Sequence, residues 1–292
     1  MLHITSNPIK VFQPQENKNV RQDPKNTKIL RVLLLELIVH NIPTNFITKY
    51  LMRHIRSILK NFYKSYVNID IWGIRMRLRI KNNLSEKRLL LSPQFFDNIE
   101  LTWMKGFLDL DDVFFDVGSN IGAYSFWAAS LERSIKIEAF EPNPTLAKRC
   151  SQIAKNNNLN TLTVNQYAIG NQNKTGILQV NQTNKGESYI DLTNQSQDGS
   201  SVTIRKLSSV ISEKGYKYIK LLKIDTEGDD LGILEKYFNE SKTDLWPKGI
   251  ICERIKEHEK TDSFFADYGY RLISSTRMNG IYLHQKSSSM II

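Results

Sequence analysis

The second half of the chain alternates between two hydrophobic patterns. Short apolar runs predict five strands, at 113–117, 136–141, 162–168, 218–225 and 249–253. Between these runs apolar residues recur every three or four positions, which predicts helices at about 122–131, 144–157, 205–213 and 229–239. Strands that alternate with helices in this way are typical of a parallel sheet covered by helices on both faces.

Two more strands complete the expected sheet. After a helix at about 260–267, Tyr270–Ser275 and Ile281–Gln285 predict an antiparallel pair around Asn279-Gly280, a dipeptide that favours hairpin turns. The polar segment Lys174–Ser201 interrupts the alternation, with one short strand at 176–180, and we expect it to cover an edge of the sheet or the mouth of a pocket. We therefore predict an α/β fold with a seven-stranded, mostly parallel sheet in residues 111–292.

The first 110 residues follow different patterns. Residues 1–27 are polar and contain three prolines, which predicts a disordered tail. Residues 28–110 predict a mainly helical, basic extension, with a hairpin at 67–80 and helices at 29–41, 46–66 and 94–108. The apolar stretch 29–39 contains two charged residues and is shorter than the roughly 20 residues that a membrane-spanning helix needs.

Charge separates the two parts of the chain. The net charge is +10, and residues 1–110 account for all of it, with 18 basic against 8 acidic side chains, whereas residues 111–292 carry 22 of each. Because the helix at 46–66 has a basic face, residues 29–66 either contact an anionic membrane peripherally or cover the core of their own domain. Residues 1–27 lack the apolar core of a secretory signal, and Cys150 and Cys252 fit buried thiols of a reducing compartment. We expect a cytoplasmic protein, with contact at the inner face of the membrane as the alternative.

The strand at 113–117 runs into a turn that contains two glycines. Asp116, Gly118 and Gly122 give the spacing D-x-G-x-x-x-G, and a helix follows. The next strand ends about twenty residues later in Glu141, where a carboxylate can accept both hydroxyls of a ribose. The glycines would let a ligand approach the backbone closely. The spacing differs from the three-glycine pattern of dinucleotide enzymes and indicates S-adenosylmethionine rather than NAD.

Five separated blocks of sequence carry a resemblance to a known family. They occur in order as Asp116–Ser125, Phe140–Pro144, Asn157–Leu159, Ala168–Gly170 and Lys223–Gly228. Together they resemble the FkbM family of S-adenosylmethionine-dependent methyltransferases over residues 110–285. Ser119 stands where that family commonly has alanine, and Thr226 where it often has valine. The resemblance implies a class I methyltransferase sheet.

The resemblance also implies roles for individual residues. Glu141 would hold the ribose of the cofactor, and Ala168 would touch its adenine. Two carboxylates would face the methyl group: Asp225 and Glu227. Four residues would line the methionine end: Asp116, Gly118, Asn120 and Gly122.

Carboxylates end the fourth and fifth strands. Asp225 and Glu227 are two residues apart and would share one face of a regular strand, and Glu253 ends the next strand. These groups could remove a proton from an acceptor hydroxyl, hold Mg²⁺ against a sugar diol, or pair with Lys223, Arg254 or backbone amides. His258 is a further candidate base, or part of an exposed loop. No metal site is predicted.

These features predict an O-methyltransferase that uses S-adenosylmethionine and acts on a hydroxyl of a sugar, glycan or other small polar molecule. Two alternatives stay open. The basic first 110 residues favour an RNA methyltransferase, but the chain lacks an N-P-P-Y-like box and has few aromatic residues among the basic ones. The second alternative is a non-catalytic protein that docks membranes or partners through residues 29–66. Intact Gly118, Gly122 and Glu141 argue against such a loss of cofactor binding.

Overall fold

The computed structural model describes residues 66–79, 82–181, 188–191, 199–226, 228–254 and 258–285. By their contacts the described residues form two compact units, one up to Asn98 and one from Ile99 onward. This division lies ahead of the predicted boundary at residue 110. The predicted tail at 1–27 and the predicted helices at 29–41 and 46–65 lie outside the described residues and stay predictions. Tyr66 begins a strand, so it does not end a helix.

The described part of the first unit is a hairpin followed by a short helix. Strands β1 (Tyr66–Ile71) and β2 (Ile74–Arg79) pair antiparallel, as predicted, with Ile71 opposite Ile74. The two turn residues, Trp72 and Gly73, have φ values of 58° and 78°, and such a two-residue turn matches the twist of the strands it joins. The alternation of the sequence is reproduced, because Ile74, Met76 and Leu78 are buried and Arg75 and Arg77 are exposed. Helix α3 (Leu84–Leu91) starts at Asn83, whose side chain accepts a hydrogen bond from the amide of Glu86.

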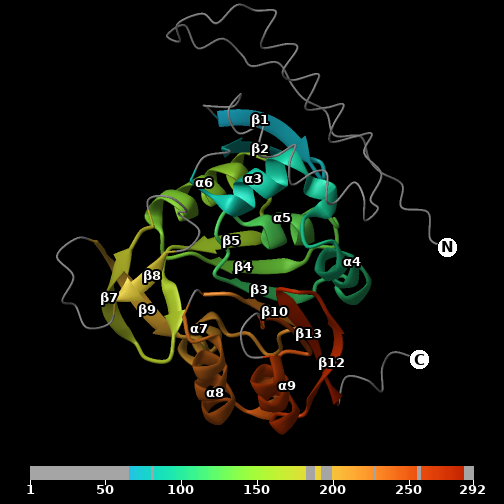
Figure 1. Ribbon diagram of the computed structural model, residues 1–292, viewed down its shortest axis with the longest axis vertical. Helices are drawn as coiled ribbons and strands as arrows, with labels where there is room; N and C mark the ends of the chain where they lie inside the picture. The colour runs from blue at the N-terminus through green and yellow to red at the C-terminus, as the bar shows by residue number, and fades with distance from the viewer. Residues whose placement is uncertain are drawn as a thin grey trace, which may run out of the picture. The chain divides into compact units, whose positions relative to one another are not determined.

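The second unit is built on a seven-stranded sheet with the order β12-β13-β11-β10-β3-β4-β5 (Figure 1). Five strands run parallel: β3 (Val113–Val117), β4 (Lys136–Phe140), β5 (Leu162–Asn165), β10 (Leu221–Ile224) and β11 (Gly249–Glu253). Strand β13 (Asn279–His284) pairs antiparallel with both β11 and β12 (Tyr270–Ser275). The predicted seven-stranded, mostly parallel sheet is confirmed.

Helices cover both faces of this sheet. Apolar side chains of three helices pack with sheet residues such as Phe115, Leu222 and Ile250 in one core: α7 (Leu207–Lys214), α8 (Asp230–Glu240) and α9 (His258–Asp267). The strands separate these helices from α5 (Ala123–Ala129) and α6 (Pro144–Asn156) in Figure 1. Helix α4 (Asn98–Phe107) contacts α5 through a hydrogen bond from Trp127 Nε1 to the carbonyl of Leu101, 2.8 Å long.

Local sequence explains where α6, the helix after β4, begins. Asn143 caps α6, because its side chain accepts hydrogen bonds from the amides of Thr145 and Leu146. Pro144 occupies the first helical position, where its missing N–H costs nothing. Asn143 lies two residues after Glu141, so the cap also fixes the chain just after the end of β4.

Two strands and one helix differ from the prediction. The predicted strand 162–168 is two strands, because β5 pairs with β4 whereas β6 (Ala168–Gly170) joins another sheet. The predicted strand 218–225 is shorter, since β10 ends at Ile224. The predicted helix 94–108 begins only at Asn98, because Pro93–Phe95 forms a short 3-10 helix and Asp97 then turns the chain with φ 36°.

The predicted position of the last hairpin turn is wrong. Asn279 and Gly280 lie in β13, where they pair with Glu253 and Cys252, and the turn consists of Thr276–Met278. Side chains explain the shift, because Thr276 Oγ1 and Asn279 Nδ2 both donate 2.9 Å hydrogen bonds to Glu100 Oε1. This carboxylate of α4 therefore fixes the start of β13 beside the end of β11.

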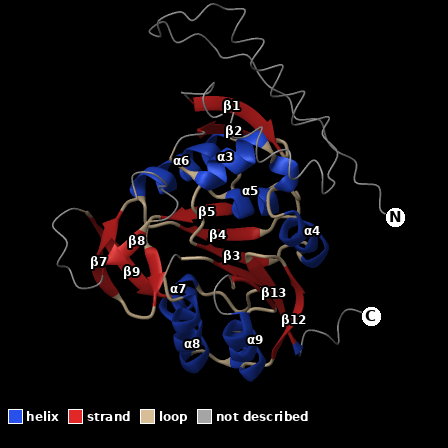
Figure 2. Ribbon diagram, in the orientation of Figure 1, coloured by secondary structure: helices blue, strands red, loops and turns tan. Residues whose placement is uncertain are grey.

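The polar segment that was expected to be an excursion forms a second sheet. Strand β6 and three further strands make a four-stranded sheet in the order β6-β9-β7-β8: β7 (Lys174–Gln179), β8 (Tyr189–Asp191) and β9 (Ser200–Lys206). Figure 2 shows β7, β8 and β9 as a group apart from the central strands. Among the helices described, none is long and apolar enough to cross a membrane.

Candidate functional site

The turn after β3 depends on its two glycines for reasons of packing. Gly118 and Gly122 have φ values of 71° and 81°, in the left-handed region that disfavours side chains. A Cβ atom on Gly118 would lie 1.8 Å from the carbonyl oxygen of Asp225, and one on Gly122 would lie 2.5 Å from Cys150 Sγ. The sequence suggested that these glycines admit a ligand. The structure shows that they also allow the residue after β10 and helix α6 to pack closely against the turn.

Asp116 is fully buried at the end of β3 and orders the helix that follows. Its Oδ2 accepts hydrogen bonds from the amide of Ser125, at 3.2 Å, and from Ser125 Oγ, at 2.6 Å. Its Oδ1 finds no hydrogen-bond donor in the described part of the chain and lies 3.9 Å from the ammonium nitrogen of Lys223. Burial raises the pKa of Asp116, and the Lys223 ammonium and the Ser125 hydrogen bonds partly offset this rise.

Glu141 joins the end of β4 to the glycine turn. Its Oε2 accepts a hydrogen bond from the amide of Asn120 and its Oε1 one from the amide of Asn143, both 2.8 Å long. Asn120 itself has a φ of 54°, so its hydrogen bond to Glu141 holds a residue with left-handed backbone conformation in place. Burial raises the pKa of Glu141 to about 7. Each carboxylate oxygen can accept a further hydrogen bond, so the group can still bind ligand hydroxyls.

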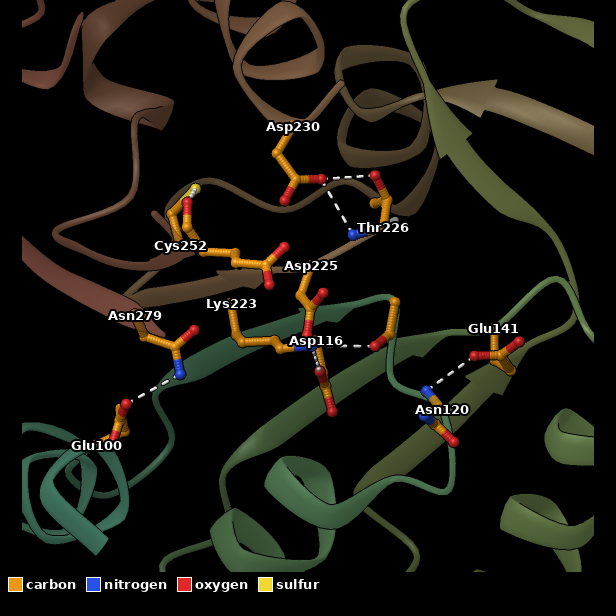
Figure 3. Close-up of polar contacts among 12 residues, drawn as sticks. Glu100, Asp116, Asn120, Glu141, Lys223, Asp225, Thr226, Asp230, Cys252 and Asn279 are labelled. Atoms are coloured by element: carbon orange, nitrogen blue, oxygen red, sulfur yellow. Dashed lines mark hydrogen bonds and ion pairs between the residues drawn. The ribbon is translucent and has the colours of Figure 1, made fainter. Parts of the chain in front are cut away.

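Lys223 lies at the centre of the site. From the sequence it was predicted only as a possible ion-pair partner of the nearby carboxylates. Its ammonium nitrogen donates a 3.0 Å hydrogen bond to the carbonyl of Gly118 and lies 3.4 Å from Asp225 Oδ2. Figure 3 shows Lys223 beside Asp116 and Asp225, with Asn120 and Glu141 further along the same edge. Burial opposes its charge, but the carboxylates of Asp225, Asp116 and Asp230 together raise the pKa of Lys223. The side chain is therefore an ammonium donor and not a proton acceptor.

The three carboxylates predicted near the ends of the fourth and fifth strands are Asp225, Glu227 and Glu253, and they differ in their surroundings. Asp225 follows β10, donates its amide hydrogen to the carbonyl of Val117 at 3.1 Å and pairs with Lys223. The pairing is one of the arrangements that the sequence left open. Strand β10 ends at Ile224, so Asp225 lies beyond the strand, and Glu227 lies outside the described residues, so its predicted position beside Asp225 stays a prediction. Glu253 is half-buried at the end of β11, the strand next to β10.

One further carboxylate at this edge was missed. Asp230, the first residue of α8, accepts hydrogen bonds at Oδ1 from the amide of Thr226, at 3.0 Å, and from Thr226 Oγ1, at 2.5 Å (Figure 3). Burial and, to a smaller extent, the charge of Asp225 raise the pKa of Asp230 to about 7. Nothing in the spacing of Asp229 and Asp230 distinguishes this residue from an ordinary acidic helix start, which is why the sequence gave no signal.

Ala168 and His258, two further candidates, belong to other elements of the fold. Ala168 is buried at the start of β6 and pairs with Ile204 of β9, so it belongs to the second sheet. His258 is the first residue of α9 and is exposed. Cys150 and Cys252 are free, buried thiols, as expected. Within the described ranges, no three histidine, cysteine, aspartate or glutamate side chains form a group that could hold a metal ion.

Comparisons with known proteins agree with the sequence blocks. A family model described as the methyltransferase FkbM domain matches residues 116–272, more than half of the chain. This range includes Asp116, the glycine turn, Glu141 and Lys223. No curated protein matched the sequence.

Solved structures show only distant similarity. The METTL16 methyltransferase domain has 12% identity and a TM-score of 0.46, over 92% of this chain and 85% of that chain. TYW2 from M. jannaschii, solved in complex with AdoMet, has 13% identity and a TM-score of 0.40, over 76% and 87%. Precorrin-6y C5,15-methyltransferase from Geobacter metallireducens has 15% identity and a TM-score of 0.38, over 65% and 86%.

Proposed function

Because the chain belongs to the FkbM methyltransferase family, we propose that it methylates a hydroxyl group of a sugar, a glycan or another small polar molecule. Membership of this family implies S-adenosylmethionine as the methyl donor. The observation that carries the proposal is the position of Glu141, which directly follows β4 and contacts the glycine turn at the carboxyl edge of the parallel strands. In open α/β sheets, ligands bind at this edge.

The residues present fit such a donor. Glu141 keeps acceptor capacity for the ribose hydroxyls, and Asp116 Oδ1 is a buried carboxylate oxygen without a hydrogen bond from the described residues, suited to a cationic group. We assign cofactor binding to six residues: Asp116, Gly118, Asn120, Gly122, Glu141 and Ala168. The bound cofactor would supply a methyl group activated by a sulfonium charge.

The acceptor-side residues would prepare the hydroxyl. Methyl transfer forms a bond between the hydroxyl oxygen and the methyl carbon, breaks the bond from that carbon to sulfur, and releases one proton. We propose that a carboxylate among Asp225, Glu227 and Glu253 receives this proton. Asp225 has structural support, because it directly follows β10 at the carboxyl edge of the sheet and lies 3.4 Å from the ammonium nitrogen of Lys223.

Calorimetry with S-adenosylmethionine tests the donor assignment. The wild type should bind the cofactor, and Glu141→Ala should weaken binding by about tenfold or more, since charged groups contribute about 1.5–3 kcal/mol per hydrogen bond. Glu259→Ala changes an exposed acid of α9 and is the matched control, expected to bind as the wild type does. Unchanged affinity in Glu141→Ala would refute the ribose assignment, and no binding by the wild type would refute the proposed function.

Transfer of a labelled methyl group tests the acceptor. The wild type would be incubated with labelled S-adenosylmethionine and, in separate reactions, with monosaccharides, nucleotide sugars, a glycan extract and total RNA. Label in a sugar-containing product that survives mild base as an ether supports the proposal. Label in RNA alone would replace the acceptor class with nucleic acid.

A further inference from the structure

Lys223 contacts both the glycine turn, where we propose that the methyl donor binds, and Asp225, which we propose lies on the side of the methyl acceptor. The residue is 6% exposed, and its ammonium nitrogen reaches the carbonyl of Gly118 at 3.0 Å, Asp225 Oδ2 at 3.4 Å and Asp116 Oδ1 at 3.9 Å. It also lies 5.5 Å from the centre of the Tyr124 ring in α5. One buried cation therefore contacts the end of β3, the glycine turn, the residue after β10 and the helix that follows the turn.

We propose that Lys223 is a positioning residue of the donor site: its ammonium group holds the Gly118 carbonyl, Asp116 and Asp225 in one arrangement and so couples the glycine turn to the acceptor-side carboxylate. This inference rests on the proposed function, because it assigns Lys223 a role toward the methyl donor. It goes beyond that function in naming the residue whose ammonium group faces both the buried Asp116 and the partly exposed Asp225.

Burial makes a positive partner necessary at this place. Asp116 is fully buried, and a buried carboxylate is costly to ionise unless a cation offsets its charge. The backbone of the turn is held at both of its polar groups, because the Gly118 amide donates to the carbonyl of Phe140 at 3.1 Å and the Gly118 carbonyl accepts from Lys223 at 3.0 Å. The ammonium thus helps to fix the backbone of the turn and also offsets the charge of Asp116.

The groups around Asp116 determine how removal of Lys223 acts. Lys223 and the Ser125 hydrogen bonds oppose the rise in the pKa of Asp116 that burial causes, whereas the charge of Asp225 adds to that rise. The groups that face Asp116 come from four places in the fold: Lys223 and Asp225 at the end of β10, Ser125 of α5, Cys150 of α6 and Glu141 after β4. Without the ammonium, Asp116 should take up a proton at a higher pH than in the wild type, and a cationic ligand should then bind less tightly on the acid side.

Four variants separate charge from hydrogen bonding. Lys223→Met removes both, Lys223→Gln keeps a donor for the Gly118 carbonyl without the charge, and Lys223→Arg keeps the charge. Lys220→Met is the matched control, because Lys220 pairs with another buried acid, Asp112, at 3.6 Å near the opposite end of β10. Affinity for S-adenosylmethionine would be measured by calorimetry from about pH 6 to 8.5, with circular dichroism to check folding.

The charge-free variants should lose affinity by about tenfold on the acid side, and the pH at which affinity begins to fall should move upward relative to the wild type. Arginine should restore the wild-type pH profile, and Lys220→Met should show it unchanged. If Lys223→Met does not fold, the comparison of Lys223→Gln with Lys223→Arg decides. Wild-type affinity and pH profile in Lys223→Gln would overturn this inference alone, whereas no binding by the wild type would overturn the proposed function and the inference with it.

Discussion

At the scale of single residues, three glycines differ in the constraints that the structure places on a side chain. Gly118 combines a left-handed backbone with a contact that leaves no room for a side chain, because its virtual Cβ meets the carbonyl of Asp225 at 1.8 Å. Gly215 has a similar φ of 71° with open space around it, and Gly106 in α4 has neither constraint. These three positions let the cost of strain be measured apart from the cost of a clash.

Alanine substitutions at these glycines should give graded changes in stability. Gly118→Ala should lower the free energy of unfolding by about 3 kcal/mol or more, because backbone atoms must move to admit the new methyl group. Gly215→Ala should cost about 1 kcal/mol from the left-handed backbone alone, and Gly106→Ala should stabilise the helix by up to about 1 kcal/mol. Urea unfolding checks the series, and equal costs for Gly118→Ala and Gly215→Ala would show that the contact with Asp225 is not tight.

Single residues also show which parts of the site can be predicted from the sequence and which cannot. Asp116, Gly118 and Glu141 were predicted as site residues because their spacing follows strand ends, and the structure places them along one edge. Lys223 was predicted only as a possible partner, since its hydrogen bond to Gly118 joins residues 105 positions apart and no local pattern encodes that contact. Asp230 was not predicted as a site residue for the same reason, because its raised pKa comes from burial in the folded protein and not from any local pattern.

At the scale of elements, a buried carboxylate holds two strands and a helix together. Glu138 of β4 accepts three hydrogen bonds of 2.8 Å, from Asn165 at the end of β5, from Lys214 at the end of α7 and from Tyr216. All the partners reach one side chain that is 4% exposed. A buried carboxylate that accepts this many hydrogen bonds fixes the relative positions of the elements that supply the donors.

Removing one donor should therefore have a measurable cost. Tyr216→Phe keeps the ring that packs edge-on against Phe115, at 5.3 Å, but loses the hydroxyl. We expect a loss of about 1–2 kcal/mol in the free energy of unfolding, because the acceptor is charged and buried. Tyr218→Phe loses a 3.0 Å hydrogen bond to Asp112 from a side chain that is 37% exposed, and should cost less. Equal losses in the two variants would show that the greater burial of Tyr216 adds nothing to its hydrogen bond, since both acceptor carboxylates are buried.

The elements that the sequence predicted well are the buried ones. Strands β3 and β11 have the predicted bounds, because all or nearly all of their residues are buried in a sheet that helices cover on both faces. The second sheet was underestimated, because β7 and β9 bury only alternate residues, such as Leu178, Val202 and Ile204, among polar ones. The last hairpin turn was misplaced because Glu100, far away in sequence, holds Thr276 and Asn279.

At the scale of the whole molecule, the sequence predicted a seven-stranded, mostly parallel sheet, since this follows from the succession of buried strands and helices. The role of the basic residues in 1–110 stays a prediction, because most of that segment lies outside the described residues. Titration of the buried acids, in contrast, depends on the folded surroundings and should appear in the stability of the entire domain.

The raised pKa of Glu141 determines whether this residue stabilises the folded protein more at low or at high pH. Burial raises its pKa from 4.5 to about 7, so the folded protein binds this proton more tightly than the unfolded chain does. The resulting stabilisation is fully present below about pH 4.5 and is lost as the pH rises through about 7, with a total of about 3 kcal/mol. Glu141→Gln removes this titration but leaves Asp230, whose pKa is raised in the same direction.

The free energy of unfolding should therefore be measured for the wild type and Glu141→Gln, without cofactor, at intervals between about pH 4.5 and 8. Other acids titrate equally in both proteins, so the difference between them isolates Glu141. We expect the wild type to lose stability relative to Glu141→Gln as the pH rises, because ionisation leaves a charge in a buried place. A constant difference, or one of opposite sign, would mean that the amides of Asn120 and Asn143 stabilise the ionised carboxylate more strongly than burial disfavours it.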